Sequence, residues 1–279
     1  MTTPPVALTI AGSDSGGGAG VQTDLVTFAA HGVHGASVIT ALTAQNTVGV
    51  DGVHVPPVEF LRAQLEAVLG DLPVAAVKTG MLATEEVVRA VAGVAAGGRL
   101  PDLVVDPVLV SSTGARLLDA GAERAYVDAL FPHALVVTPN TREASALVGG
   151  TVATAADAVE AARELGRLGP AWVVVKGGHQ LDEADGGAAS SEAIDVVFET
   201  ATGVVTELRA PRVDTRNDHG TGCTFAAATA ALLARGVPVP EALAGAKRFV
   251  HAGLVASAGW HLGAGHGPVG KLASWPFGA

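Results

Sequence analysis

Short apolar runs alternate with longer amphipathic segments from the first residues to about residue 176, and this alternation constrains the fold more than any other feature. Repeated strand–helix–strand units place parallel strands in a sheet that helices bury on both faces. The sequence therefore predicts an α/β fold with a mostly parallel central sheet. The expected strands are Val6–Ala11, Ala36–Ala41, Ala75–Lys78, Leu103–Asp106, Ala134–Thr138 and Ala171–Lys176.

Helix-length segments separate most of these strands and carry recognisable start signals. Thr84 and Thr154 stand directly before two of them, where a hydroxyl can accept a hydrogen bond from the first helical turn. The expected helices are Val21–Ala30, Val58–Leu69, Glu85–Ala95, Ala122–Leu130 and Ala155–Leu168.

The pattern changes after residue 191, where two β-rich runs are separated by a short turn. We interpret them as a β-hairpin near the cofactor end of the sheet, preceded by a small, glycine-rich surface loop and followed by two helices. No repeat and no linker interrupts the chain, so residues 1–279 are expected to form a single domain. The segments are the loop Gln180–Ser191, the hairpin Ala193–Glu199 and Gly203–Leu208, and the helices Thr221–Arg235 and Pro240–Ala258.

Composition and charge exclude several functional classes. The formal net charge is -10 and no lysine or arginine run is present, so the chain lacks the electrostatic footprint of a nucleic-acid-binding protein. The apolar stretches are shorter than the roughly 20 residues of a membrane helix, and no secretory signal is visible. A single cysteine excludes an internal disulfide and a multi-cysteine metal site. A cytoplasmic location fits these features best.

A first glycine-rich turn, Gly12–Gly20, leaves the first strand and opens a helix. Its backbone amides can lie against a ligand at the carboxyl end of that strand. It lacks the Gly-Lys-Ser/Thr of a P-loop and the downstream acid of a dinucleotide fingerprint. Taken alone, it is either a ligand-contacting loop or a tight turn.

A second glycine-rich turn, Asn217–Thr224, precedes an alanine-rich helix. The amides of Gly220, Thr221, Gly222 and Cys223 are expected at the helix N-terminus, where they form an anion hole. The same field is expected to lower the pKa of Cys223. The alternative is that Cys223 is a small buried residue in the first helical turn.

Several further motifs follow in a fixed order, and with them the chain resembles the hydroxymethylpyrimidine and phosphomethylpyrimidine kinases of the ribokinase-like superfamily. This resemblance implies a three-layer α/β/α fold and spans residues 5 to 270. Besides the two glycine turns, the motifs are Ile39–Thr47, Lys78–Leu82, Val105–Val108, Thr138–Asn140 and Val175–His179.

The resemblance also implies roles for individual residues. Gln45 is expected to hydrogen-bond the pyrimidine edge, and a pocket completes the substrate site. ATP and Mg²⁺ are the implied cofactors. The pocket residues are Asp24, Ala19, Gly12 and Met81; the nucleotide residues are Lys176, Asn140, Glu143 and Thr221; the magnesium residues are Asp106 and Glu143; the catalytic residues are Cys223, Gly220, Thr221, Gly222 and Lys176.

Considered without the resemblance, several of these residues have ordinary structural explanations. Gln45 is then a loop residue, Met81 a core residue and Lys176 a charge at a strand end. Glu143 is then an acid favoured at a helix N-terminus. The superfamily usually carries an aspartate base where Cys223 stands, so a thiol that assists deprotonation of the substrate hydroxyl is a hypothesis.

Two departures from the family pattern limit what is carried over. Asp218 stands where many members have threonine, and it either contacts magnesium or faces solvent. No role is assigned to Leu109–Gly114. The remaining histidines show no metal-ligand spacing and are expected to be structural or surface residues: His31, His34, His54, His133, His251, His261 and His266.

The sequence therefore predicts an enzyme that phosphorylates 4-amino-5-hydroxymethyl-2-methylpyrimidine with ATP, and then its monophosphate, for thiamine diphosphate synthesis. Pyridoxal kinase of the same branch is the alternative enzyme, because both substrates are flat heteroaromatics with a hydroxymethyl group. A catalytically idle vitamin-binding protein is the alternative from another class. The family suggests a homodimer.

Overall fold

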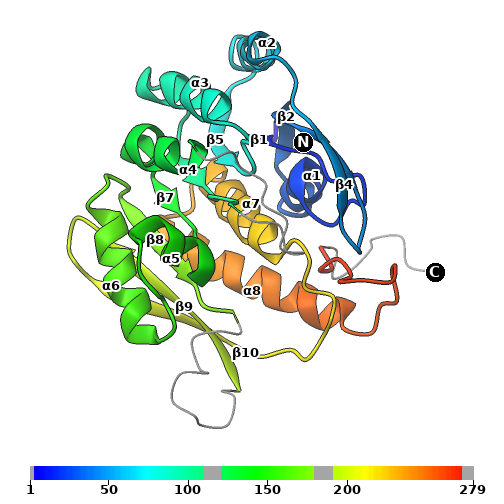
Figure 1. Cartoon of the computed structure of the whole chain (residues 1–279), viewed down its shortest axis with the longest axis vertical. Coiled ribbons are helices and arrows are strands. Elements are labelled where there is room, and N and C mark those ends of the chain that lie inside the picture. The colour runs from blue at the N-terminus through cyan, green and yellow to red at the C-terminus, as the bar shows by residue number, and fades with distance from the viewer. Residues whose placement is uncertain (1–2, 110–120, 179–190, 272–279) are drawn as a thin grey trace.

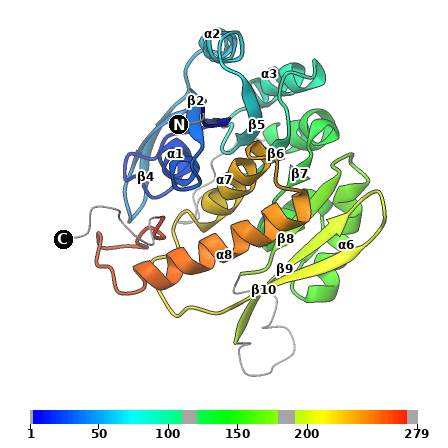
Figure 2. The same cartoon turned by 180° about the vertical axis from the view of Figure 1, so that it is seen from behind.

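The predicted strand–helix units form a three-layer α/β/α structure in which a central sheet lies between two sets of helices (Figures 1 and 2). The computed structural model describes residues 3–109, 121–178 and 191–271. The expected loop at residues 180–190 and residues 110–114 of the unassigned run lie outside these ranges.

The central sheet has eight strands in the order β10-β9-β8-β7-β6-β5-β1-β2. The strands from β8 to β2 pair in parallel, whereas β9 pairs antiparallel with β8 and with β10. The prediction of a mostly parallel sheet with an appended hairpin is therefore confirmed. The strands are β1 Val6–Ala11, β2 His34–Ile39, β5 Val74–Thr79, β6 Leu103–Val105, β7 Val136–Val137, β8 Trp172–Lys176, β9 Glu192–Glu199 and β10 Val205–Pro211.

Helices cover both faces of this sheet because successive strand side chains point to opposite faces. In β6, Leu103 and Val105 join one buried apolar cluster and Val104 joins the other. The first cluster packs under α2 Val58–Leu69, α3 Glu85–Ala96, α4 Ala122–Ala125, α5 Thr141–Val148 and α6 Ala155–Gly166. The second packs under α1 Gly20–Ala30, α7 Thr221–Ala234 and α8 Val239–Ser257.

The predicted helix starts are also confirmed. The hydroxyls of Thr84 and Thr154 accept hydrogen bonds from Val87 N and Asp157 N, at 3.3 and 3.1 Å. None of the helices in the described ranges combines the length and the apolar character needed to cross a bilayer.

Several parts of the expected secondary structure differ from the fold, among them α5, which was not expected. The strand expected at Ala36–Ala41 begins and ends two residues earlier, as β2. A two-stranded antiparallel sheet, β3 Leu42–Gln45 and β4 Val50–His54, follows it and was not expected. The helix expected at Ala122–Leu130 keeps α-helical geometry only in α4 and then widens into a π-helical turn at Tyr126–Leu130.

Candidate active site

The candidate site residues converge at the carboxyl ends of the parallel strands. Gly12 follows β1, Met81 lies just past β5, Asp106 follows β6 and Lys176 ends β8. Ligands bind at this edge in open α/β sheets because the loops that leave the strands meet there. Motifs that are far apart in the sequence come together at this edge because β1, β5, β6, β7 and β8 are neighbours in the sheet.

The first glycine turn is held closed by the carboxylate of Asp14. Its Oδ1 accepts a hydrogen bond from Gly16 N and its Oδ2 accepts one from Ala19 N, each at 2.8 Å. Gly20 has a φ of +59°, and a Cβ there would lie 2.5 Å from the carbonyl oxygen of Gly12. The backbone therefore requires glycine where the turn enters α1.

The second glycine turn packs directly on the first. Gly220 precedes the first residue of α7 with a φ of +82°, and a Cβ on it would overlap the carbonyl oxygen of Gly18. The helical bonding of α7 begins when Thr224 N donates to Gly220 O at 2.8 Å. Four backbone amides were expected to form the anion hole. Among them, the amide of Thr221 donates to Asp218 O at 3.3 Å and so already has a backbone partner.

A cavity of about 320 Å³ lies between the two glycine turns, β3 and the ends of the central strands. Four of the five residues expected at the pyrimidine line it, namely Gly12, Ala19, Gln45 and Met81. A Cβ on Gly12 would lie 2.4 Å from Cε of Met81, so the absence of a side chain makes room for the thioether. The cavity is also lined by Cys223, Gly220, Thr221, Gly222, Lys176, Asn140, Glu143 and Asp106.

Asp24 is the exception, and the expectation that it lines the pocket needs correction. It is fully buried beneath the cavity on α1, where Lys78 Nζ lies 2.8 Å from its Oδ2 and Thr9 Oγ1 donates to the same oxygen at 2.6 Å. Burial opposes the charged form of both groups and raises the pKa of Asp24, but Asp24 and the other acidic groups nearby together raise the pKa of Lys78. Asp24 therefore serves as the counter-ion of Lys78, which does line the cavity.

A second cavity of about 570 Å³ adjoins the first and reaches across β9, β10 and α8. The two cavities have a common wall at the N-terminus of α7 and the ends of β7 and β8. The residues that line both are Asn140, Arg142, Lys176, Asp218, Thr221 and Gly222.

A buried charge cluster lies beside this common wall. Lys176 Nζ is 2.7 Å from Asp106 Oδ1, which also accepts from Thr138 Oγ1 at 3.1 Å. Glu143 has an exposed fraction of 5%, and burial raises its pKa to about 7, although the nearby Lys176 opposes the shift. Burial likewise opposes the charge of Lys176, but Asp106 and Glu143 raise the pKa of its ammonium.

The start of α5 explains how Glu143 is held. Glu143 N donates to Asn140 Oδ1 at 2.9 Å, and Asn140 N donates to Glu143 Oε2 at 2.8 Å. This reciprocal capping box fixes both side chains at the first turn of an eight-residue helix, which was not among the expected helices although Glu143 was considered as an acid at a helix N-terminus. The Asn-x-x-Glu spacing, with Gly149 in the left-handed region after the helix, was the available signal.

The geometry fits a divalent cation held through few protein ligands. Asp106 and Glu143 are two carboxylates beside one cavity, and the pKa of Glu143 is raised first by burial and further by the nearby Asp106. Mg²⁺ commonly binds through one or two carboxylates, with phosphates and water completing its shell. Within the described ranges, no group of three or more His, Cys, Asp and Glu side chains is arranged as a metal site.

The expected lowering of the Cys223 pKa is wrong. Cys223 lines the first cavity at the start of α7, but burial raises the pKa of its thiol, and the nearby Lys78 ammonium only partly offsets this effect. Desolvation penalises the thiolate more than the helix N-terminus and Lys78 favour it. The thiol is therefore protonated at neutral pH in this structure.

Asp218 reaches solvent at the mouth of the site. Its Oδ1 lies 2.8 Å from Nδ1 of His266. The side chain of His266 is 53% exposed and that of Asp218 is 36% exposed. Asp218 lines both cavities and His266 lines the second one, so a histidine from the surface group stands beside the site.

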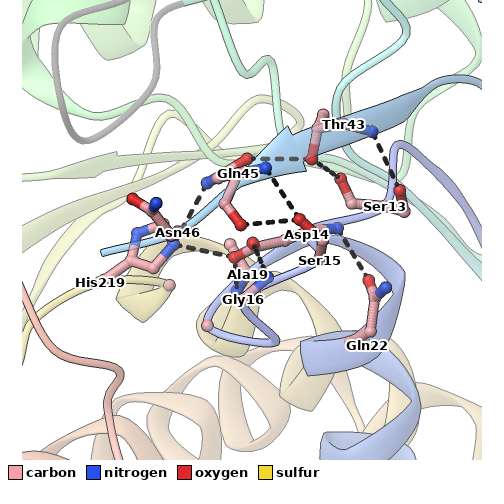
Figure 3. Close-up of polar contacts among 12 residues, drawn as sticks. Ser13, Asp14, Ser15, Gly16, Ala19, Gln22, Thr43, Gln45, Asn46 and His219 are labelled. Carbon is pink, nitrogen blue, oxygen red and sulfur yellow. Dashed lines mark hydrogen bonds and ion pairs between the residues drawn. The ribbon is translucent and has the colours of Figure 1, made fainter. Parts of the chain in front are cut away.

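No sequence pattern indicated a role for Asp14, His219 or Lys78, although all three lie inside recognised motifs. Nε2 of His219 is 3.0 Å from Asp14 Oδ2 and 3.4 Å from Gln45 Nε2, so it connects both glycine turns to β3 (Figure 3). These contacts join residues up to 205 positions apart, and a local pattern does not report such distances.

Comparisons with known proteins agree with this geometry. A family model described as phosphomethylpyrimidine kinase matches residues 14–270. The hydroxymethylpyrimidine/phosphomethylpyrimidine kinase of Rhizobium meliloti is 47% identical, and the match covers 97% of this chain and 98% of the relative. The thiamine biosynthesis bifunctional protein ThiED of Geobacter sulfurreducens is 46% identical, but the chain spans only 52% of its length.

Solved structures show the same fold. An ADP complex of Bacillus subtilis pyridoxal kinase has a TM-score of 0.88 at 36% identity, covering 97% of this chain and 98% of that one. Phosphomethylpyrimidine kinase from Clostridium difficile has a TM-score of 0.75 at 37% identity, covering 88% and 97%. The expected ribokinase-like architecture is confirmed, and the chain belongs to the phosphomethylpyrimidine kinase family.

Proposed function

We propose that this protein uses ATP to phosphorylate 4-amino-5-hydroxymethyl-2-methylpyrimidine and then the resulting monophosphate, giving the diphosphate used in thiamine diphosphate synthesis. One observation carries the proposal: two cavities meet at a common wall made of the α7 N-terminus, Lys176 and Asn140. A phosphoryl transferase needs its acceptor and its nucleotide on opposite sides of one anion-stabilising element.

The first cavity suits the acceptor. Gln45 can both donate to and accept from a heteroaromatic edge, and Met81 offers a polarisable surface to a flat ring. Cys223 lies in the first turn of α7 and lines the cavity, where a substrate hydroxyl would meet the amides of Gly222 and Cys223. Because its thiol is protonated at rest, Cys223 acts first as a hydrogen-bonding partner of that hydroxyl.

The second cavity suits the nucleotide, and it extends to the hairpin that the sequence analysis expected at the cofactor end. Lys176 lies between the cavities, where its ammonium can neutralise charge on the transferred phosphoryl group. Asp106 and Glu143 are the residues that would hold Mg²⁺, which supplies charge neutralisation on the phosphates when bound. The amides at the start of α7 orient the phosphoryl group and stabilise its developing charge.

A coupled ADP-release assay tests the proposal. It compares 4-amino-5-hydroxymethyl-2-methylpyrimidine with pyridoxal and resolves the monophosphate and diphosphate products. We expect pyrimidine-dependent ADP release with accumulation of the diphosphate. Absence of turnover despite pyrimidine binding would instead favour a vitamin-binding protein.

Pyridoxal kinase is the second candidate, and a specific observation favours it: the Bacillus subtilis pyridoxal kinase structure matches nearly the whole chain at a TM-score of 0.88. Turnover of pyridoxal alone in the same assay would reassign the first cavity. It would leave the proposed nucleotide site unchanged.

We further infer a single kinase domain that acts in the cytoplasm as a homodimer. One continuous eight-stranded sheet supports the single domain. The exposed apolar side chains Leu42, Val48 and Val53 on β3, β4 and their turn support an interface between copies of the chain. Light scattering after size exclusion, repeated across protein concentrations, tests the dimer.

A further inference from the structure

The side chain of His219 lies where the two glycine turns and β3 meet (Figure 3). Its exposed fraction is 8%, and its backbone is fixed on both sides, because His219 N donates to Gly267 O and Val269 N donates to His219 O, each at 3.0 Å. The ring therefore has a defined position between Asp14 and Gln45, and the proton on Nε2 decides what each neighbour can do.

Asp14 determines the location of that proton. Its two carboxylate oxygens already accept hydrogen bonds from Gly16 N and Ala19 N. Burial opposes ionisation, but the hydrogen bonds from His219 and these amides keep the pKa of Asp14 below its ordinary value. An ionised carboxylate can only accept, so Nε2 of His219 must carry hydrogen and donate to Asp14 Oδ2 at 3.0 Å.

Thr43 imposes a matching constraint at the other end of the Gln45 amide. Its hydroxyl donates to the carbonyl oxygen of Ser13 at 2.9 Å, and a carbonyl oxygen can only accept. The single hydroxyl hydrogen is thus committed. Toward Gln45, whose amide lies 3.3 Å away, the Thr43 oxygen can act only as an acceptor.

Both constraints select one orientation of the Gln45 amide. We propose that Asp14 and His219 are positioning residues which, together with Thr43, turn the carbonyl oxygen of Gln45 toward His219 and its amino group toward Thr43. This exchanges the two amide atoms relative to Figure 3, where nitrogen faces nitrogen at 3.4 Å. Oxygen and nitrogen of an amide have nearly the same shape, so the hydrogen-bond network decides between them.

The selected orientation gives the first cavity a directional edge. After its contacts with His219 and Thr43, Gln45 retains one amide hydrogen and one oxygen lone pair in a fixed order. An amide pairs through such an edge with an N=C–NH₂ group, as glutamine does with adenine. This inference rests on the proposed function and deepens it. The remaining donor and acceptor of Gln45 together select an aminopyrimidine whose amino group neighbours the reacting hydroxymethyl group. A reversed amide would require the ring to turn over, carrying that group away from Cys223.

Calorimetric binding to the whole protein without nucleotide tests the inference, using the aminopyrimidine and an analogue with hydrogen in place of its amino group. For the wild type we expect a loss of affinity of about 10- to 100-fold on removal of the amino group. In His219→Phe, which has no donor, this discrimination should shrink to about three-fold or less. His219→Gln places a donor amide near the same point and should keep the discrimination within about three-fold of the wild type.

Equal weakening of both ligands in His219→Phe, or unchanged discrimination, would overturn the inference, because a structural defect does not sense the amino group. If His219→Phe does not fold, Thr43→Val serves in its place, since it removes the acceptor that holds the amino end of Gln45 and should reduce discrimination likewise. A wild type that binds both ligands equally also overturns it. Discriminating binding without ADP release would remove the proposed function and leave this positioning intact.

Discussion

At the scale of single residues, Glu143 links stability to pH. Its folded pKa of about 7 lies above its ordinary value of 4.5, so the folded protein retains this proton to higher pH than the unfolded chain does. The contribution of Glu143 to stability is therefore greatest below pH 4.5 and falls as pH rises to 7. Glu143→Gln removes the titration but keeps an oxygen for the Asn140 amide.

We expect Glu143→Gln to gain stability relative to the wild type between pH 5 and pH 8, by an amount of the order of 3 kcal/mol. Urea unfolding of both proteins at the two pH values measures it. Asp71→Asn, which changes an exposed carboxylate, is the matched control and should follow the wild type. Parallel pH profiles for Glu143→Gln and wild type would contradict the assigned pKa.

Lys176 is the cation on which two buried carboxylates depend. Its replacement by methionine leaves Asp106, whose side chain is only 3% exposed, without its ionic partner, and removes the charge that opposes the raised pKa of Glu143. We expect Lys176→Met to lose about 3 kcal/mol of unfolding free energy and at least about 100-fold in kcat/KM.

Urea unfolding and steady-state kinetics measure both effects. Arg99→Met breaks the Arg99–Glu66 pair, whose side chains are 41% and 62% exposed, and should leave stability and kinetics unchanged within measurement error. A Lys176→Met protein with wild-type stability would show that the buried carboxylates do not need this ammonium.

At the scale of elements, the contact between the two glycine turns leaves no room for a single methyl group on Gly220. Gly220→Ala places a Cβ into the carbonyl oxygen of Gly18 and also strains a φ of +82°. Gly203→Ala strains a similar φ of +73° with no atom within 4 Å of the new Cβ. The two variants therefore separate backbone strain from collision.

We expect Gly203→Ala to cost about 1 kcal/mol with unchanged kcat/KM, because a left-handed residue alone carries that penalty. Gly220→Ala should cost at least about 3 kcal/mol and lower kcat/KM at least about 100-fold, since α7 must move away from the first turn. Thermal unfolding and the ADP-release assay provide the readouts. Equal effects of the two substitutions would mean that the turns do not need their close contact.

The same scale shows why sequence patterns predicted the central strands and missed the small β3–β4 sheet. The central strands are apolar runs buried on both faces, and such runs stand out in any sequence. In β3 and β4 five of the nine positions are polar or glycine, all nine are exposed or half-buried, and β3 begins only three residues after β2 ends. The hydroxyl of Ser15, 30 positions away in the sequence, accepts from the N–H of Gln45 in β3 and donates to its carbonyl.

The residues of the candidate site were likewise predicted only in part from the sequence. Local motifs identified Gln45, Lys176, Asn140, Glu143 and the α7 N-terminus, and the structure brings all of them to adjoining cavities. Burial was not visible in the motifs, so the counter-ion role of Asp24 and the raised pKa of Cys223 were not predicted. Asp14 and His219 were not predicted to interact because they are 205 positions apart in the sequence.

At the scale of the whole molecule, the two cavities predict that the pyrimidine and the nucleotide bind side by side and can be separated by mutation. Leu254 on α8 lines only the second cavity, and it lies outside both apolar cores. Leu254→Trp therefore fills nucleotide space without touching Gln45, Met81 or Cys223. The neighbouring Val255 is 56% exposed and lines neither cavity, so Val255→Trp is a matched control on the same helix.

We expect Leu254→Trp to weaken binding of a non-hydrolysable ATP analogue at least about 10-fold while pyrimidine affinity stays within about two-fold of wild type. Val255→Trp should change neither affinity. Calorimetric titration of each ligand, alone and in the presence of the other at saturation, supplies the measurement. Loss of pyrimidine affinity in Leu254→Trp would mean that one ligand occupies both cavities, and the division of the molecule into an acceptor side and a nucleotide side would then be wrong.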